Sequence, residues 1–453
     1  MMAGAVVEGL QELVRAQYPR GATSRSLPMS VLRRTAIAAL AGTSIEYYDF
    51  FLYGTASALV FPTVFFPSEA TATSLLASFS SFAIGFLARP LGAVIFGHIG
   101  DRRGRKPALV VALLLMGAAT TLIGCLPSYA QVGAVAPVLL VALRLLQGLA
   151  LGGQWGGAIL IVTEDAPPSR RGFYGSFAQM GAPLGAIFAN VIFLVVSAIV
   201  GSDGLLSWAW RIPFLLSIAL IGVALITQFK LQDTVAFRAF REIEAHRPGI
   251  GVGGSPVVKS FRLFPKQILQ AAGAFVAMNV SFYVLVTFSL AYGSNASGLS
   301  IPSSTMLTGV LLGAIVMVPG TFLSSVISDR WGRRSILIAS SALLACWAFA
   351  LFPLLNTRTL WGICTALCVG QFLNGMIFGP LAPLFSELFP PAVRYSGASL
   401  AYQLGAILGG ALAPLVATSL LIRFGTPAVS IYMAVMCVIT IVSVWSISEP
   451  RSA

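Results

Sequence analysis

The chain has 453 residues, of which 57% are hydrophobic and only 9% charged, and its formal net charge is +13. Soluble domains carry about 25% charged residues, so this chain lacks the charge needed to cover a water-exposed surface of its size. The composition excludes an ordinary soluble enzyme, a nucleic-acid-binding module and a disordered tail, and it indicates a polytopic membrane protein.

Twelve apolar segments follow one another along the chain, each long enough for a membrane-spanning helix, which needs about 20 residues. The predicted spans are 35–61, 74–99, 107–126, 132–162, 173–200, 208–231, 265–292, 302–327, 335–356, 359–385, 396–422 and 427–447. We predict an all-α integral membrane protein with two six-helix halves, 35–231 and 265–447. A tail (1–34), a polar central loop (232–264) and a second tail (448–453) would all be cytoplasmic.

The positions of Arg and Lys support this topology. With both termini in the cytoplasm, 23 of the 28 basic residues fall on the cytoplasmic side, as the positive-inside rule requires. Only Arg211, Arg358 and Arg423 fall on the outer side, and Arg89 and Arg144 lie within spans. The alternation explains the basic balance of the chain without a nucleic-acid partner.

Two motifs recur in the same order in both halves. The segment GHIGDRRGRK, starting at Gly97, joins spans two and three, and SVISDRWGRR, starting at Ser325, joins spans eight and nine. The segment EDAPPSRR, starting at Glu164, is echoed 223 residues later by ELFPPAVR, starting at Glu387. The repeats indicate two units of parallel orientation with the substrate path between them.

The first motif matches G-x-x-x-D-R-x-G-R-K, the signature of the major facilitator superfamily. Further stretches narrow the resemblance: GTSIEYYDFFLYG from Gly42, FLARPLG from Phe86, RLLQG from Arg144 and GGQWGG from Gly152. Together they resemble the metabolite:proton symporter family, which includes proline/betaine, α-ketoglutarate, citrate, shikimate and aromatic-acid permeases. This chain departs from the pattern in having Gln154 where many relatives carry Glu, and Ser325 where the signature begins with Gly.

The resemblance implies a secondary transporter of the bacterial inner membrane that takes up a small organic acid or zwitterion with a proton, by alternating access. We expect a functional monomer in the lipid bilayer, with no cofactor, no metal and no nucleic-acid partner. The alternative within the same superfamily is a proton-driven exporter of drugs or metabolites. An enzyme is not expected, because no His lies in a span interior to complete a nucleophile–base set.

Four charged residues are predicted to lie deep in the membrane: Glu46, Asp49, Arg89 and Arg144. Such charges are costly and persist where they face a cavity or a partner. Proton coupling needs an acid that binds a proton on one side of the membrane and releases it on the other as its surroundings change. Asp49 is the first candidate and Glu46 the second, and both share a predicted helical face with Tyr53.

Arg144 is expected to grip a substrate carboxylate with its planar guanidinium, and Arg89 is either a second anion clamp or a counter-ion. The predicted substrate path consists of Tyr53, Arg89, Arg144, Gln147 and Gln154. The alternative is a buried ion pair that joins spans one and four. At the repeat offset of 223 residues, the position equivalent to Arg144 is Leu367. The charge therefore belongs to one half only, which favours a substrate role.

The signature segments are predicted to act as conformational latches. Asp101 lies at the level where it can meet the positive N-terminal end of a neighbouring helix, and Arg105 can pair with Asp101 or Glu164. The predicted latch residues are Gly97, Asp101, Arg105 and Glu164 in the first half and Asp329, Arg333 and Glu387 in the second. The alternative is a plain positive-inside anchor, which suffices for the other basic residues of these segments.

Overall fold

The computed structural model describes residues 29–103, 105–152, 159, 162–163, 166–230, 261–295, 298–389 and 394–447, and these contain helices and turns but no strand. Helices satisfy their backbone hydrogen bonds internally, which is what a chain must do where no water is available. The predicted all-α class is confirmed.

Six helical rods form the described part of the first half. They are α2 (Met29–Leu59), α4 (Thr71–Arg103), α5 (Arg105–Gly124), α7 (Val135–Leu151), α9 (Arg171–Gly204) and α10 (Arg211–Lys230). Short turns connect some of them: α3 (Phe61–Val64), α6 (Tyr129–Val132), η1 (Pro168–Arg170) and η2 (Leu205–Ala209).

The second half repeats this plan, with two rods that contain a π-helical segment. The first rod passes from α13 (Pro265–Tyr283) through η3 (Val284–Phe288) into α14 (Ser289–Ser294), and another from α18 (Arg394–Gly405) through η4 (Ala406–Ala411) into α19 (Ala413–Phe424). The others are α15 (Ser303–Trp331), α16 (Arg333–Asn356), α17 (Leu360–Leu388) and α20 (Thr426–Trp445). Within the described residues, the rods follow the twelve predicted spans.

The signature segments are tighter turns than the sequence suggested. Helix α4 continues to Arg103 and α5 begins at Arg105, so Asp101 lies in the last turn of a helix. The second signature has the same form, because α15 ends at Trp331 and α16 begins at Arg333. Gly332 between them has a φ of 85°, a left-handed conformation that favours glycine.

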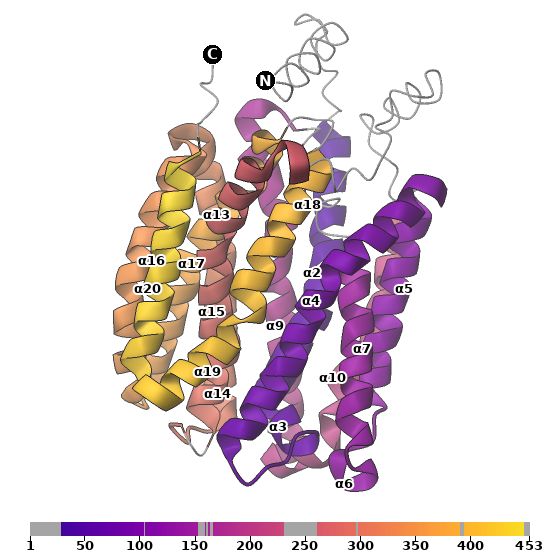
Figure 1. Cartoon of the computed structure of the whole chain (residues 1–453), viewed down its shortest axis with the longest axis vertical. Helices are drawn as coiled ribbons and strands as arrows, with labels where there is room; N and C mark the ends of the chain where they lie inside the picture. Colours follow the sequence, from indigo (N-terminus) through magenta and orange to yellow (C-terminus); the bar gives the residue numbers. More distant parts are fainter. Residues whose placement is uncertain are drawn as a thin grey trace, which may run out of the picture.

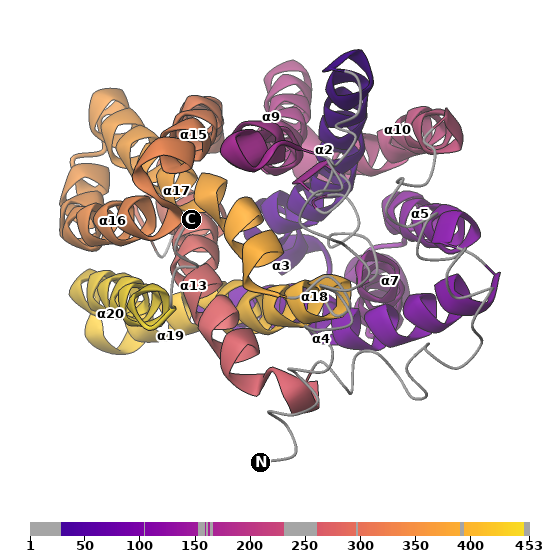
Figure 2. The same ribbon diagram turned by 90° about the horizontal axis from the view of Figure 1, so that it is seen from above.

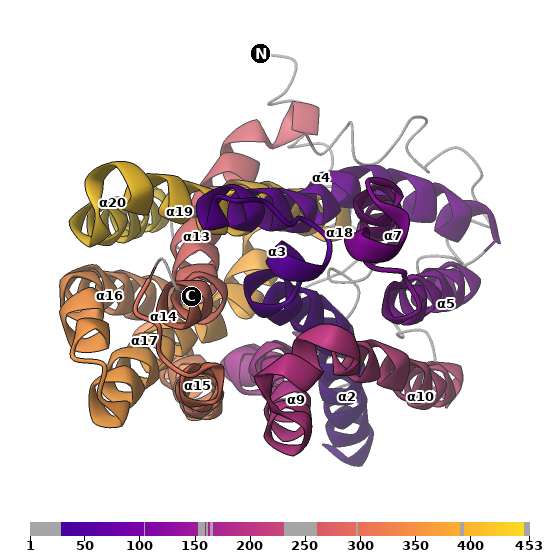
Figure 3. The same ribbon diagram turned by 90° about the horizontal axis from the view of Figure 1, so that it is seen from below.

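The two halves lie side by side (Figure 1), and Figures 2 and 3 show them from either end. Between them, α9 packs against α15 and α17, α2 against η3 and α14, and α4 against α18, η4 and α19. We call the end of the bundle where α4 and α15 finish the signature end, and the end that carries α3 and α6 the opposite end.

The outward faces of the rods are apolar. Leu91, Ile199 and Trp361 are 63%, 77% and 84% exposed, among many other large hydrophobic side chains. Exposed apolar side chains in such number mark contact with a membrane or a partner. Among the described residues, eight helices are long and apolar enough to cross a bilayer, and α5 and α7 contribute shorter apolar stretches. The chain is therefore an integral membrane protein.

Candidate substrate and coupling site

A cluster of aromatic rings joins the two halves in the middle of the bundle. Phe50 of α2 lies 5.0 Å from Phe86 of α4, measured between ring centroids. Phe82 lies 5.3 Å from Phe86 and 5.6 Å from Tyr283, the last residue of α13. All four side chains are buried. Because Tyr283 belongs to the second half, this aromatic cluster forms part of the interface between the halves.

Two guanidinium groups rest on the aromatic cluster. The Arg89 guanidinium carbon lies 4.5 Å from the Phe50 ring centre and 4.3 Å from that of Phe86. The Arg144 carbon lies 4.9 Å from the Phe50 and Phe82 centres and 4.1 Å from that of Tyr53. Stacking on ring faces partly replaces the water that a buried cation loses.

Neither arginine forms a salt bridge within 4.0 Å in the part of the chain that the structure describes. Arg144 is 1% exposed, and its Nε and Nη2 atoms have no hydrogen-bond partner. The predicted alternative, an ion pair that joins spans one and four, is therefore not formed among the described residues in this conformation. A buried guanidinium with two unused donor atoms is a ready binding group for an anion.

Arg144 reaches the cluster by crossing α4 at Gly85, where a Cβ atom would overlap its guanidinium. Its Nη1 atom donates a hydrogen bond of 3.1 Å to Gln147, whose amide donates one of 2.7 Å to the hydroxyl of Thr120 on α5. Gln147 is thus committed to neighbouring side chains rather than pointing freely into a substrate path.

Asp49 lies on the other side of Thr120, inside the first half. Its Oδ1 atom accepts a hydrogen bond of 2.7 Å from Ser217 of α10, and Thr120 is its neighbour on α5. The side chain is 2% exposed, and Oδ2 has no partner. A buried carboxyl group with a free oxygen beside hydroxyl groups can take up a proton without losing its contacts.

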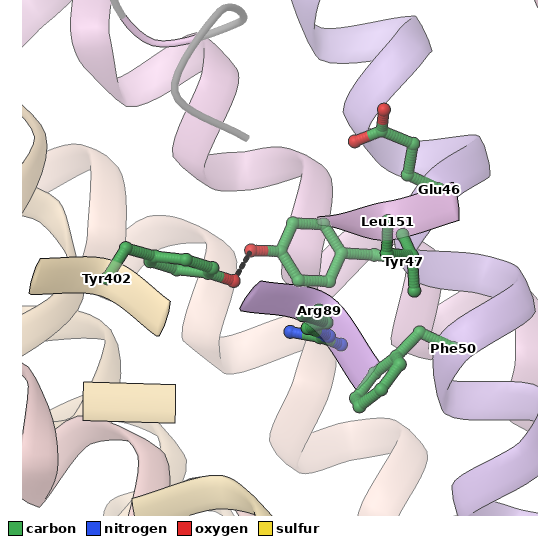
Figure 4. A pocket seen from close by; sticks show the side chains of 6 residues that line it. All are labelled: Glu46, Tyr47, Phe50, Arg89, Leu151 and Tyr402. Atoms are coloured by element: carbon green, nitrogen blue, oxygen red, sulfur yellow. Dashed lines mark hydrogen bonds between the residues drawn. The ribbon is translucent and has the colours of Figure 1, made fainter. Parts of the chain in front are cut away.

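Glu46 lines a small pocket between the halves, shown in Figure 4. The other lining residues are Tyr47, Phe50, Arg89, Leu151 and Tyr402. The hydroxyl groups of Tyr47 and Tyr402 lie 3.1 Å apart and link α2 to α18. The pocket therefore brings one predicted acid and one predicted cation together with a residue of the second half.

The shared helical face predicted for Glu46, Asp49 and Tyr53 does not lead to one common cavity. Glu46 faces the pocket, Asp49 bonds to α10, and the Tyr53 hydroxyl lies 2.8 Å from that of Ser81 on α4. Positions three and four residues apart on a helix still differ in direction by about 40° to 60°, so the three side chains have different surroundings.

Some predicted site residues lie beyond what the structure describes. Gln154 and Glu164 are outside the described residues, and only the backbone is described for Gly97, Asp101 and Arg105. In addition, the sequence analysis did not single out Thr120, Ser217 or Tyr402. Single hydroxyl groups are common in membrane helices, so nothing in their local pattern marks them.

At the signature end, Asp329 of the second half contacts the start of α9 in the first. Its two carboxylate oxygens accept hydrogen bonds from the backbone N–H groups of Gly172 and Phe173, at 2.9 and 3.0 Å. Arg333 pairs with Asp329 at 2.7 Å and with Glu387 at 3.4 Å. A carboxylate at a helix N-terminus satisfies unpaired donors and the helix dipole together.

Contacts between the halves lie on both sides of the pocket. Toward the signature end, Gln179 of α9 donates a hydrogen bond of 2.9 Å to the carbonyl of Phe378 in α17. Toward the opposite end, the rings of Phe51 and Phe282 lie 4.8 Å apart, and α14 packs against α2. In this conformation the two halves therefore touch on both sides of the pocket.

The family model for the Major Facilitator Superfamily matches residues 40–407. The chain belongs to this family. A putative metabolite transport protein of Haemophilus influenzae is 39% identical over 94% of this chain and 98% of its own length. The shikimate transporter of Escherichia coli is 35% identical over 94% of this chain and 97% of its own. A proline/betaine transporter of Salmonella typhimurium is 30% identical over 84% and 76%.

The xylose transporter XylE of E. coli has a solved structure with a TM-score of 0.70 and 16% identity, covering 94% of this chain and 99% of that one. This likeness confirms the major facilitator fold. The relatives confirm the resemblance to metabolite:proton symporters. The protein is a membrane transporter of a small molecule and not an enzyme.

Proposed function

We propose that this transporter takes up a small organic anion together with a proton, by alternating access. The observation that carries the proposal is the pair Arg89 and Arg144. Both are buried on the aromatic cluster between the halves, and neither forms a salt bridge in the described part of the chain. An anion that enters there would meet two cations and the unused donors of Arg144.

A carboxylate is favoured over a quaternary ammonium group such as that of betaine. A quaternary ammonium is held by free aromatic faces, and here the rings of Phe50, Tyr53, Phe82 and Phe86 already carry guanidinium groups. The name of the shikimate transporter indicates a carboxylate substrate, and that of the proline/betaine transporter a zwitterion. A zwitterion is therefore the second candidate, because Arg144 would also grip its carboxylate.

Proton coupling follows from the charge of the same site. Glu46 shares the pocket with Arg89, and Asp49 lies behind Thr120, which bonds to the Gln147 that supports Arg144. Protonation of either acid leaves a surplus positive charge near the arginines that a carboxylate can cancel. Asp49 is proposed as the proton site because its Oδ2 atom has no partner. Glu46, which shares a pocket with Arg89, is the alternative.

For alternating access, we propose that the contact of Asp329 with α9 parts when the signature end opens. The positive-inside rule puts that end in the cytoplasm of a bacterial cell, together with 1–34, 232–264 and 448–453 and both termini. The halves 35–231 and 265–447 would rock as units within one functional monomer.

Uptake by the purified protein in liposomes tests the proposal. With an inward proton gradient, radiolabelled shikimate should accumulate and betaine should not, and Arg144→Gln should strongly weaken shikimate binding. Accumulation of betaine alone would overturn the anion assignment. Comparing right-side-out with inverted vesicles gives the direction, and accumulation only in inverted vesicles would support an exporter.

A further inference from the structure

Two buried amide side chains on α17 have no hydrogen-bond partner. Gln371 and Asn374 are 1% and 0% exposed, and the oxygen and nitrogen atoms of both amides are unpaired. Buried amides normally form hydrogen bonds, so four unpaired atoms on two residues that are three positions apart need an explanation. Elsewhere, the buried amide of Asn190 on α9 is bonded at both ends, to Ala186 and Thr55.

Asn374 belongs to the face of α17 that meets the first half. Asn374 and Phe378 are four residues apart, so they follow one helical face, and the carbonyl of Phe378 accepts the hydrogen bond from Gln179 of α9. Asn374 therefore continues, toward the opposite end, a face that already contacts the other half. Gln371 lies one turn before Asn374 and packs against Gly313 of α15.

The amides also lie at the depth of the aromatic cluster. A Cβ atom on Gly370, the residue before Gln371, would touch Leu285 of η3. Leu285 is two residues beyond Tyr283, whose ring packs on Phe50, Phe82 and Phe86. The same segment of the second half thus contacts both the start of the amide pair and the rings beneath the two arginines.

We propose that Gln371 and Asn374 bind hydroxyl groups of the substrate, so that the substrate is a hydroxylated carboxylate held by both halves. An amide offers a donor and an acceptor, and a hydroxyl group can use both. Arg144 would hold the carboxylate from the first half while the amide pair holds the hydroxyl groups from the second. This inference rests on the proposed function and specifies its substrate class.

The test compares two probes with purified protein, shikimate and cyclohexenecarboxylate, which has the same acid group and no ring hydroxyls. Binding is measured by isothermal titration and by the shift in unfolding temperature. We expect shikimate to bind at least about tenfold more tightly, because a site built for hydroxyl groups rejects an analogue without them. The variants Gln371→Met and Asn374→Leu keep side-chain volume and should lower shikimate affinity toward that of the deoxygenated acid.

Three comparisons make the result decisive. Arg144→Gln should weaken both probes by the same factor, since it removes the carboxylate contact. Gln270→Met, a matched change at an exposed amide of α13 that bonds to Ser446, should leave the preference intact. Asn374→Ser, a smaller polar change, should lose part of the preference and covers the case in which the apolar variants do not fold.

The amide assignment is overturned if the wild-type protein binds both acids equally, or if folded Gln371→Met and Asn374→Leu variants keep the preference. If Arg144→Gln still weakens binding in those cases, the proposed transport of a carboxylate is retained and only the amide assignment is wrong. If neither acid binds, or Arg144→Gln changes neither affinity, both proposals are wrong.

Discussion

The two halves form the two walls of the proposed substrate path, the first half the first wall and the second half the second wall. These walls differ in charge although they derive from the same repeat. The first half contributes the buried side chains of Asp49, Arg89 and Arg144 and the half-buried side chain of Glu46. In the described spans of the second half, charged side chains lie at helix ends, and Leu367, the counterpart of Arg144, is fully buried. The second wall would present the amides Gln371 and Asn374 and the ring of Tyr283 instead.

We propose that this difference lets one fold separate two tasks. Protonation changes the charge of the first wall alone, so it alters the attraction for an anion without affecting the second wall. The second wall can then recognise neutral groups and carry the closing contact. Asp329 extends from the second half to α9 of the first, so closure and charge reside on opposite sides of the path.

The largest effect should come from removing the proposed proton site of the first half. We expect Asp49→Asn to abolish accumulation driven by a pH gradient while downhill exchange persists, because Asn keeps the shape but carries no proton. The measurement is uptake of labelled shikimate into liposomes with and without the gradient. Glu46→Gln serves as the comparison, and if Asp49→Asn accumulates like the parent, Glu46 becomes the candidate.

The next largest effect concerns the binding of the substrate by Arg144 of the first half. Arg144→Lys keeps the charge but loses the planar pair of donors, so binding should weaken about ten- to hundredfold, as expected for hydrogen bonds to a charged group. Titration of the purified variant with shikimate measures it. Parent-like affinity in a folded Arg144→Lys protein would remove this residue from the substrate site.

A smaller effect should follow from weakening the contact that Asp329 of the second half makes with α9 of the first. Asp329→Asn weakens the bonds to the N–H groups of Gly172 and Phe173 and should shift the population toward opening at the signature end by about tenfold. Labelling of single cysteines on each side of the path reports the shift. Unchanged labelling and transport would reduce the signature to an orientation signal, and Asp101→Asn gives the matched test in the first half.

The smallest effect should come from the amide that supports Arg144. Gln147→Leu removes the hydrogen bonds to Arg144 and Thr120 and should weaken shikimate binding about fivefold or less, the scale of one neutral hydrogen bond. The measurement is the same titration. A loss as large as that of Arg144→Lys would mean that Gln147 itself contacts the substrate.

Sequence analysis predicted much of the candidate site because intramembrane charge is rare enough to stand out. Arg89 and Arg144 were found in this way, and both lie on the aromatic cluster. The approach failed where the signal is an ordinary polar residue. Gln371 and Asn374 resemble any amide in an apolar helix, and only their burial without partners distinguishes them.

Contacts between distant segments could not be predicted for a related reason. The sequence placed Asp101 and Asp329 at a level suited to a helix N-terminus, but it did not identify α9 as the partner of Asp329, 157 residues away. Likewise, Glu46 and Asp49 are three residues apart, yet Glu46 lines the pocket that contains Arg89 and Asp49 bonds to Ser217. A difference of less than one helical turn decided which helix each acid meets.

The membrane class, the twelve spans, the duplicated halves and the position of charge in one half could all be predicted from the amino-acid sequence. These features follow from composition and spacing, because a bilayer admits only long apolar helices and tolerates few buried charges. Two features became visible only in the folded chain: the arginines stack on rings instead of pairing with the acids, and Asp329 contacts α9. Those contacts depend on how helices far apart in the chain pack, which no local pattern encodes.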